Sequence, residues 1–496
     1  MARWESNIVR LMGVIEIVLG IALLVPTFIA LSYGEDPMVF VYPVPILLIL
    51  GMLQYIFFKR GGTIKPASGL LMIFIAWWMT FLVSSIPFYL SGLSALDSIF
   101  EGISGFTTTG ISMVSSNASY SIFFWEAFTQ WAGGIAIVLV FLFLIPMMGL
   151  GGRSFLNNEL SGSDTYNYSM RVRNTVRNFI SIYILLSVVE AVLLMISGVG
   201  PFESVTMMFS TISTGGFMAI GGSMADYPFA AQVIVLAFMF LGGTNFYLHY
   251  RAFLRRDLSA YSSSQEFVWT VIWFLIATVA LLAILAISAD SINVVESGST
   301  VWNTLFTVVS MGTTTGYLIV DQPFWPLAAY IVLWTVMLFG SMSGSTSGGV
   351  KVYRLLILRS YVANGIYKMF HPRSVTVVRM DGHSVNDDAV VSAIVVFVMF
   401  MLVLIASTIF LLLSQPGIDI SESFGLSISA ISNSGVNIGS VSFTDLTAVS
   451  KAFMMLMMWV GRLEVVIALL IFSRTFWSDL IMDIKSGRHS NRRRED

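Results

Sequence analysis

Four short stretches of this chain end in glycine after a run of hydroxyl-bearing residues, and each could bind a desolvated cation through backbone oxygens. They read Phe106-Thr-Thr-Thr-Gly110, Ile212-Ser-Thr-Gly-Gly216, Gly312-Thr-Thr-Thr-Gly316 and Ser432-Asn-Ser-Gly435. Glycine permits a positive φ, so successive carbonyl oxygens can turn to one side. A β-branched threonine before it stiffens the turn and adds an oxygen. Four such loops around one axis would form a ring of carbonyls that replaces the hydration shell of an ion.

The four stretches recur at similar intervals and follow similar segments. Aligned on Gly110, Gly215, Gly316 and Gly435, they lie 105, 101 and 119 residues apart. A half-apolar segment precedes each one, and short helices are expected over 97–106, 202–212, 303–312 and 422–431. Such segments are too short and too polar to cross a bilayer, so at membrane depth they must be buried in protein or line water.

The candidate ion-binding residues are the aligned glycine of each turn and the two residues before it. They are Thr108, Thr109, Gly110, Ser213, Thr214, Gly215, Thr314, Thr315, Gly316, Asn433, Ser434 and Gly435. None of them is charged, which favours a monovalent cation over calcium. One such motif alone would be an ordinary glycine turn, but four in register indicate an internal repeat.

Composition excludes most other classes of protein. Of the 496 residues, 56% are hydrophobic and 11% are charged, whereas soluble domains are about 45–50% apolar and about 25% charged. The formal net charge of −2 gives no electrostatic argument for binding nucleic acid. With no cysteine, disulfides, thiolate metal sites and cysteine nucleophiles are excluded. The ionisable groups in the apolar segments are isolated, so a membrane-embedded enzyme is not indicated.

The apolar segments predict a polytopic membrane protein, since about 20 mostly apolar residues cross a bilayer as a helix. Ten spans are expected, over 8–32, 39–58, 67–90, 121–147, 178–198, 229–250, 267–289, 326–342 and beyond 350, 389–413 and 451–476. With a cytoplasmic N-terminus, 24 of the 26 Lys and Arg residues fall on the inner side. This alternation predicts that both termini are cytoplasmic. The outer segments are acidic, which would concentrate cations there.

The expected fold is an all-α polytopic membrane protein with four pseudo-symmetric repeats around a central pore. Each repeat consists of a span, a short helix, a turn and a second span. Two extra N-terminal helices occupy 1–65. The repeats are expected over 66–160, 161–262, 263–382 and 383–496, and the last repeat includes a basic cytoplasmic tail.

The combination of motifs resembles the Trk/Ktr/HKT superfamily of potassium transporters and is most similar to the membrane subunit of the Trk system. The extra N-terminal pair of spans fits Trk better than the smaller Ktr subunits. The resemblance is carried by 104–110, 130–134, 210–217, 242–246, 249–251, 313–317, 344–351 and 461–464.

The resemblance implies potassium uptake across the cell membrane through a channel-like pore, with potassium coordinated by the carbonyls of the four turns. It further implies a homodimer in the lipid membrane and a separate cytosolic regulatory subunit of TrkA type that binds NAD or ATP/ADP. No cofactor is expected in this chain. A carrier that couples potassium to sodium or protons remains the alternative.

One of the four turns departs from the family pattern. The fourth reads Ser432-Asn-Ser-Gly-Val-Asn437 where the family has Asn-Asn-Ile-Gly-Pro-Gly. The rigid Pro-Gly pair is therefore missing. In the first turn, Gly110 stands where sodium-transporting plant relatives carry serine, which favours potassium.

The eighth span is interrupted by the small-residue run Gly-Ser-Met-Ser-Gly-Ser-Thr-Ser-Gly-Gly at 340–349. Glycine and serine are poor helix formers, so one interpretation is a loop that gates the pore below the turns. The other is close helix packing through small residues. Arg462, in the middle of the last span, is either an electrostatic barrier in the pore or a structural partner of Glu464 or Glu190. The candidate gate residues are Gly344, Ser345, Thr346, Ser347, Gly348, Gly349, Lys351 and Arg462.

Overall fold

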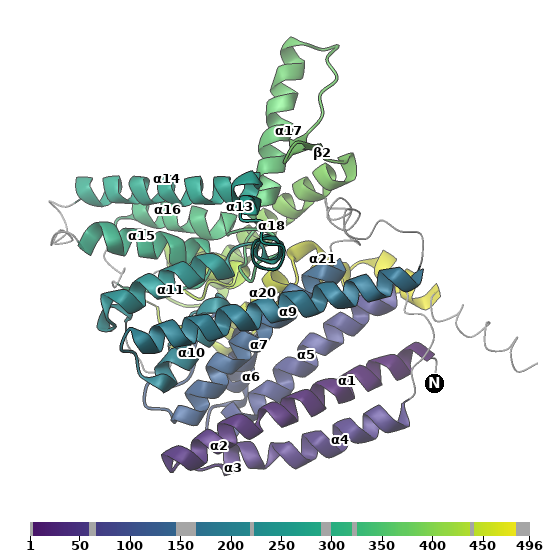
Figure 1. Ribbon diagram of the computed structural model, residues 1–496, viewed down its shortest axis with the longest axis vertical. Coiled ribbons are helices and arrows are strands. Elements are labelled where there is room, and N and C mark those ends of the chain that lie inside the picture. The colour runs from purple at the N-terminus through teal and green to yellow at the C-terminus, as the bar shows by residue number, and fades with distance from the viewer. Residues whose placement is uncertain are drawn as a thin grey trace, which may run out of the picture.

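The computed structural model describes residues 3–58, 66–144, 165–218, 223–288, 299–319, 325–436 and 441–482. Within these ranges the chain is helical apart from turns and one antiparallel hairpin of β1 (Arg379–Met380) and β2 (His383–Ser384). The prediction of an all-α membrane protein is therefore confirmed. Most of the long helices run side by side, whereas α17 (Val352–Phe370) and the hairpin project beyond them (Figure 1).

The N-terminal segment forms a separate pair of spans at one side of the molecule (Figure 1). Its helices are α1 (Arg3–Ala22), α2 (Leu24–Tyr33), α3 (Met38–Val41) and α4 (Pro43–Phe57). Gly13 and Gly51 face each other closely, since a Cβ on either would lie 2.6 Å from the carbonyl oxygen of the other. Small residues let the backbones of α1 and α4 approach, which is how membrane helices commonly pack.

The rest of the chain contains four groups of a long helix, a short helix and a further apolar helix. The first two groups are α5 (Pro66–Leu90), α6 (Ala95–Phe106) and α7 (Tyr120–Leu144), then α9 (Thr165–Ile196), α10 (Pro201–Ile212) and α11 (Phe229–Gly242). The other two are α14 (Gln265–Ile287), α15 (Ser299–Gly312) and α16 (Leu327–Phe339), then α18 (Asp387–Ser414), α19 (Ile420–Ser432) and α20 (Ala448–Arg462). The four short helices lie where the sequence predicts them.

The long helices are apolar on both sides, as expected in lipid. On α18, Ala393, Phe400 and Leu404 are buried, while Val398 and Leu402 are about half exposed. A helix that is hydrophobic all round requires an apolar environment outside the protein as well as inside. Seven of the ten predicted spans are present as single apolar helical segments among the described residues.

The other three predicted spans are broken, and two of the breaks differ from the sequence prediction. The expected span over 229–250 ends at Gly242, and a segment beginning at Phe246 continues at an angle of 103°. The expected span over 451–476 ends at Arg462, and α21 (Val465–Leu470) follows. The third break, after Phe339, is the predicted one.

Backbone features explain these breaks. Gly243-Thr-Asn separates α11 from α12 (Phe246–His249), and the Asn245 side chain caps α12 by accepting from the Tyr247 amide at 2.9 Å. After α20, Glu464 has a φ of 65°, which a continuous helix cannot contain. The short α13 (Ser259–Ser263) leads into α14.

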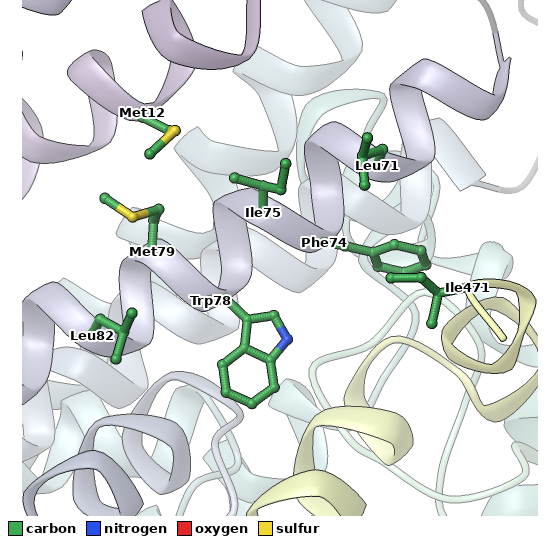
Figure 2. Close-up of a pocket in the computed structure, with 8 residues that line it drawn as sticks. All are labelled: Met12, Leu71, Phe74, Ile75, Trp78, Met79, Leu82 and Ile471. Carbon is green, nitrogen blue, oxygen red and sulfur yellow. The ribbon is translucent and has the colours of Figure 1, made fainter. Parts of the chain in front are cut away.

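An apolar recess lies along α5, between Met12 of α1 and Ile471, the residue that follows α21 (Figure 2). Its lining consists of Met12, Leu71, Phe74, Ile75, Trp78, Met79, Leu82 and Ile471. These eight side chains offer no oxygen ligand for a cation. The recess therefore belongs to the lipid-facing surface and not to a route for ions.

Candidate cation pathway

Each short helix ends in a turn with the same backbone hydrogen bonds. We name these turn one (107–110), turn two (213–216), turn three (313–316) and turn four (432–435). In each turn, the third residue donates its amide to the carbonyl of a serine five residues earlier. The pairs are Thr109–Ser104, Gly215–Ser210, Thr315–Ser310 and Ser434–Ser429, at 2.9, 2.8, 2.8 and 3.0 Å.

The turns also share an uncommon backbone conformation. The second residue of each is a non-glycine residue with positive φ: Thr108 at 51°, Thr214 at 54°, Thr314 at 56° and Asn433 at 56°. Threonine rarely adopts this region because of its branched Cβ. The same uncommon angle at four equivalent positions, three of them threonine, shows that the surrounding structure imposes one geometry on all four turns.

The structure corrects the sequence alignment of turn two by one residue. The glycines with positive φ that end the turns are Gly110 (86°), Gly216 (78°), Gly316 (88°) and Gly435 (66°). Gly216, and not Gly215, is therefore the equivalent of Gly110, and Ser213 corresponds to Thr107. Two consecutive glycines made the register ambiguous in the sequence. Backbone hydrogen bonds and φ angles resolve it.

The four turns meet in a closed ring. A Cβ added to Gly110 would overlap the Gly215 carbonyl oxygen of turn two. In the same way Gly216 lies against the Thr315 carbonyl, Gly316 against that of Ser434, and Gly435 against that of Thr109. Each contact joins the final glycine of one turn to the third residue of the next, so the fourth contact returns to turn one. Glycine is required at all four positions by close approach as well as by φ.

In three of the four turns, the hydroxyl groups of the first and third residues form a hydrogen bond with each other. In turn one, the Thr107 and Thr109 hydroxyls lie 2.7 Å apart. The equivalent pair in turn three, Thr313 and Thr315, is 2.8 Å apart, and the Ser432 hydroxyl of turn four donates to Ser434 at 3.3 Å. In turn two the third residue is a glycine, so this hydroxyl pair is missing there.

Two side-chain amides also hold the ring, and the sequence did not reveal either role. Asn433 Nδ2 donates to the Thr109 hydroxyl at 3.0 Å and to the Met458 carbonyl at 2.8 Å, which ties turn four to turn one. From α7, Gln130 Nε2 donates to the Gly215 carbonyl at 2.7 Å. Buried amides at such positions must be hydrogen-bonded, and here their partners are parts of the ring.

The interrupted segment between α16 and α17 lies directly against the ring. The Thr346 hydroxyl contacts the Thr214 hydroxyl at 3.1 Å and donates to the Gly242 carbonyl at 3.0 Å. The Gly348 amide donates to the Thr314 hydroxyl at 2.8 Å, and a Cβ on Gly348 would overlap the Ser432 carbonyl. The segment therefore touches turns two, three and four. The segment makes these contacts as an irregular loop and not as a helix, so they differ from the helix-to-helix packing of the alternative interpretation.

Two buried cations hold the carbonyls of this segment. Arg462 Nη1 donates to the Thr346 carbonyl at 2.6 Å, and Lys351 Nζ donates to the carbonyl of the next residue, Ser347. Lys351 has a φ of 77° and is the residue that immediately precedes α17. Arg462 is 3% exposed. The candidate gate residues are thus brought together beside the ring.

Arg462 does not pair with either carboxylate that the structural alternative proposed. Glu464 instead forms an ion pair with Arg354 of α17. Among the residues that the structure describes, no carboxylate pairs with Arg462, and its Nε and Nη2 have no hydrogen-bond partner. Its charge beside the segment is therefore not neutralised by a carboxylate in the described part of the chain.

A further buried carboxylate fixes both ends of the interrupted segment. Glu266, at the start of α14, accepts from the Ser343 amide at 2.6 Å and from the Tyr353 amide at 3.2 Å. Glu266 lies at one end of an apolar helix, and nothing in the sequence around it indicated that it contacts the interrupted segment. Glu266 thus ties the segment and the start of α17 to α14, and the Arg354–Glu464 pair ties α17 to the break between α20 and α21.

Lys451, the basic residue that the charge pattern places on the outer side, lies beside an acid of the first short helix. Its Nζ is 2.7 Å from Asp97 Oδ1. This ion pair joins α20 to α6 at the seam where the fourth repeat meets the first. It is the same seam that Asn433 bridges within the ring.

Comparison with known proteins places this arrangement in a family. The family model described as TrkH, a cation transport protein, matches residues 48–484. The chain is 29% identical over 485 residues to the Trk system potassium uptake protein TrkH of Escherichia coli strain K12, covering 95% of this chain and 99% of that protein. It is 27% identical over 493 residues to the Trk system potassium uptake protein TrkI of Halomonas elongata, covering 96% and 97%.

A solved structure shares the fold. The crystal structure of the potassium transporter TrkH from Vibrio parahaemolyticus superposes with a TM-score of 0.85 at 27% identity, covering 95% of this chain and 99% of that one. The family match spans all four turns and the interrupted segment. This chain is thus a multi-pass membrane protein and belongs to the TrkH family of cation transport proteins.

Proposed function

We propose that this protein takes up potassium across the cell membrane through the ring of four turns. The observation that carries the proposal is the closed ring, in which each terminal glycine lies against a carbonyl of the next turn. Backbone oxygens of turns that contain no charged residue suit a weakly hydrated monovalent cation. The relatives named as potassium uptake proteins, aligned over almost their full length, support the choice of ion.

The interrupted segment at 340–351 serves as the gate in this proposal. Its contacts with Thr214, Thr314 and Arg462 support that role, because an ion leaving the ring on this side would meet the segment. The ion-binding residues are those of the four turns in the corrected register, with Gly216 added. Potassium is the transported substrate, and no cofactor in this chain takes part.

The remaining parts of the proposal concern assembly. The protein forms a homodimer and is regulated by a separate cytosolic nucleotide-binding subunit of TrkA type, with both termini of this chain in the cytoplasm. The four repeats and the N-terminal pair of spans form its structural units. The proposal of a cytosolic subunit is supported by α17 and the β1–β2 hairpin, which project beyond the long helices (Figure 1). The basic residues that cluster there support a cytoplasmic location of this part of the chain.

Cation flux into liposomes that contain the purified protein tests the proposal. Uptake of potassium and rubidium should exceed uptake of sodium and lithium, and empty liposomes give the background. The reversal potential should follow the potassium gradient alone. Absence of flux, or equal flux of all four cations, would contradict the proposal. A reversal potential that also moves with the sodium or proton gradient would favour the coupled carrier.

A further inference from the structure

Turn two is built differently from the other three, and the difference lies in its third residue. Thr109, Thr315 and Ser434 occupy this position in the other turns and pair through their hydroxyls. Gly215 occupies it in turn two, although it does not have a positive φ. The backbone of Gly215 therefore does not require glycine, and something else must explain why no side chain is present.

The side chain of Gln130 fills the space that a residue larger than glycine would need. A Cβ on Gly215 would lie 2.5 and 2.6 Å from the Gln130 amide oxygen and nitrogen. Gln130 Nε2 donates to the Gly215 carbonyl at 2.7 Å, and Oε1 accepts from the Phe217 amide at 3.2 Å. Because Phe217 offers an N–H and Gly215 a carbonyl, these partners fix the orientation of the amide. Gln130 is 0% exposed.

The equivalent positions in two other repeats carry methionine. On α7, Gly133 lies against the carbonyl of Phe106, the last residue of α6. Gly242 and Gly461 make the same kind of contact with the carbonyls of Ile212 and Ile431. The residues three positions before these glycines are Gln130, Met239 and Met458. The polar residue is therefore on the helix next to the turn without a hydroxyl pair.

We propose that Gln130 is a positioning residue for ion selectivity: its amide replaces the missing hydroxyl pair and fixes the Gly215 carbonyl in the ring. This inference rests on the proposed function of the four turns as an ion-selective ring. The Gly215 carbonyl is the one that lies against Gly110, so Gln130 sets the contact between turns one and two. A turn held by two buried hydrogen bonds resists the contraction that a smaller cation such as sodium would require.

A double-mutant cycle tests the proposal. The variants are Gln130→Ala, Gly215→Thr and the combination of both, and the ratio of potassium to sodium permeability is measured from reversal potentials in liposomes. Gln130→Ala should lower this ratio about fivefold, which corresponds to the roughly 1 kcal/mol of one hydrogen bond. Gly215→Thr alone should abolish most flux, because its side chain overlaps Gln130. The double variant should regain flux and most of the selectivity, since the introduced threonine then has space and a hydroxyl partner in Ser213.

Met239→Ala is the matched control, because it truncates a buried side chain at the equivalent position of α11. It should leave the permeability ratio unchanged. If Gln130→Ala does not assemble, Gln130→Met, with the residue found at the equivalent positions 239 and 458, nearly keeps the volume but loses the amide donor and acceptor, and it should lower the ratio as well.

The failure of this inference differs from a failure of the proposed function. Wild-type protein without selective potassium flux would overturn the proposed function. Selective wild-type flux with an unchanged ratio in Gln130→Ala, or a double variant no better than Gly215→Thr, would overturn the role of Gln130 alone.

Discussion

The four turns of the ring resemble one another in structure, whereas the helices that follow them do not. The four turns share the backbone hydrogen bond from the third residue to a serine, the positive φ angles of the second and fourth residues and the contacts between neighbouring turns. The helices after them differ: α7 continues unbroken through Gly133, whereas α11, α16 and α20 all end. Only the break after α16 contains a long irregular segment, and that segment touches three of the turns.

The difference separates two tasks. An ion in a ring meets all four turns at once, so selection requires four equal backbones. A gate needs one element that can take up two positions. A single irregular segment that lies against a symmetric ring can move in this way without changing the ring. Variants in the ring should therefore change which ion passes, and variants in the segment should change how much passes.

The largest effect is expected from Gly110→Ser. The new Cβ would overlap the Gly215 carbonyl and would adopt a φ of 86°, which disfavours any residue but glycine. The ratio of potassium to sodium permeability should fall by about tenfold or more, equivalent to about 1.4 kcal/mol. Reversal potentials measured in liposomes check this.

Gly198→Ser is the control for backbone strain. Gly198 has a φ of 95°, but no atom lies within 4 Å of an added Cβ. The ratio of potassium to sodium permeability in Gly198→Ser should equal that of the wild type. An unchanged ratio in Gly110→Ser with flux intact would remove Gly110 from the ion-binding ring.

Arg462→Ala should raise potassium flux about tenfold with little change in selectivity. Two unit charges 4 Å apart interact by about 4 kcal/mol at an effective dielectric of 20, so even a fraction of this repulsion is a substantial barrier. Arg462→Lys should keep most of the barrier. Flux is measured per correctly assembled protein, and Arg10→Ala in the N-terminal pair serves as control. A fall in flux for Arg462→Ala would make the residue structural.

Asn433→Ala should have an intermediate effect on the seam between turns four and one. It removes the hydrogen bonds to Thr109 and Met458 and places a less tolerant residue at a φ of 56°. We expect a threefold to fivefold loss of selectivity, comparable to the loss of about 1 kcal/mol from one buried hydrogen bond. Asn433→Gly tolerates the positive φ but also lacks the two side-chain hydrogen bonds. Equal selectivity in Asn433→Gly and the wild type would therefore show that these hydrogen bonds do not contribute to selectivity.

The smallest effect is expected from Lys451→Gln at the outer end of the same seam. The ion pair with Asp97 is partly exposed, and such pairs contribute about 0.2–1 kcal/mol. Thermal unfolding in detergent should shift downward by a few degrees at most, and the shift should shrink at high salt. A large loss of stability would mean that the seam holds the repeats together more strongly than the ring does.

Sequence reasoning located the elements of the ring but not its register. Hydroxyl residues and glycine at repeated intervals predicted four short helices and four turns, because special φ angles demand special residues. The pair Gly215-Gly216 offered two equivalent alignments, and only hydrogen bonds to Ser210 and the φ of Gly216 distinguish them. Gln130 was visible as a polar residue in an apolar span, but its partner was 85 residues away.

The breaks in the spans show a similar limit. The glycine- and serine-rich run at 340–349 predicted its own break, since its composition cannot maintain a helix. The breaks after Gly242 and Arg462 occur in sequence that is apolar on both sides. At the first break, the short Gly243-Thr-Asn stretch and its Asn245 cap are local, but a single short stretch did not stand out in an apolar span. At the second, Glu464 pairs with Arg354, which is 110 residues away and cannot be derived from local composition.

The most direct test of the division between ring and gate is one measurement on a protein that lacks residues 344–347. The backbone hydrogen bonds of the turns lie within the turns and short helices, so the ring should survive this deletion. Flux and permeability ratio are measured together in liposomes. We predict a severalfold rise in potassium flux, with the potassium-to-sodium ratio within about twofold of the wild type. A folded deletion protein whose ratio falls to that of Gly110→Ser, or which conducts nothing, would contradict the account.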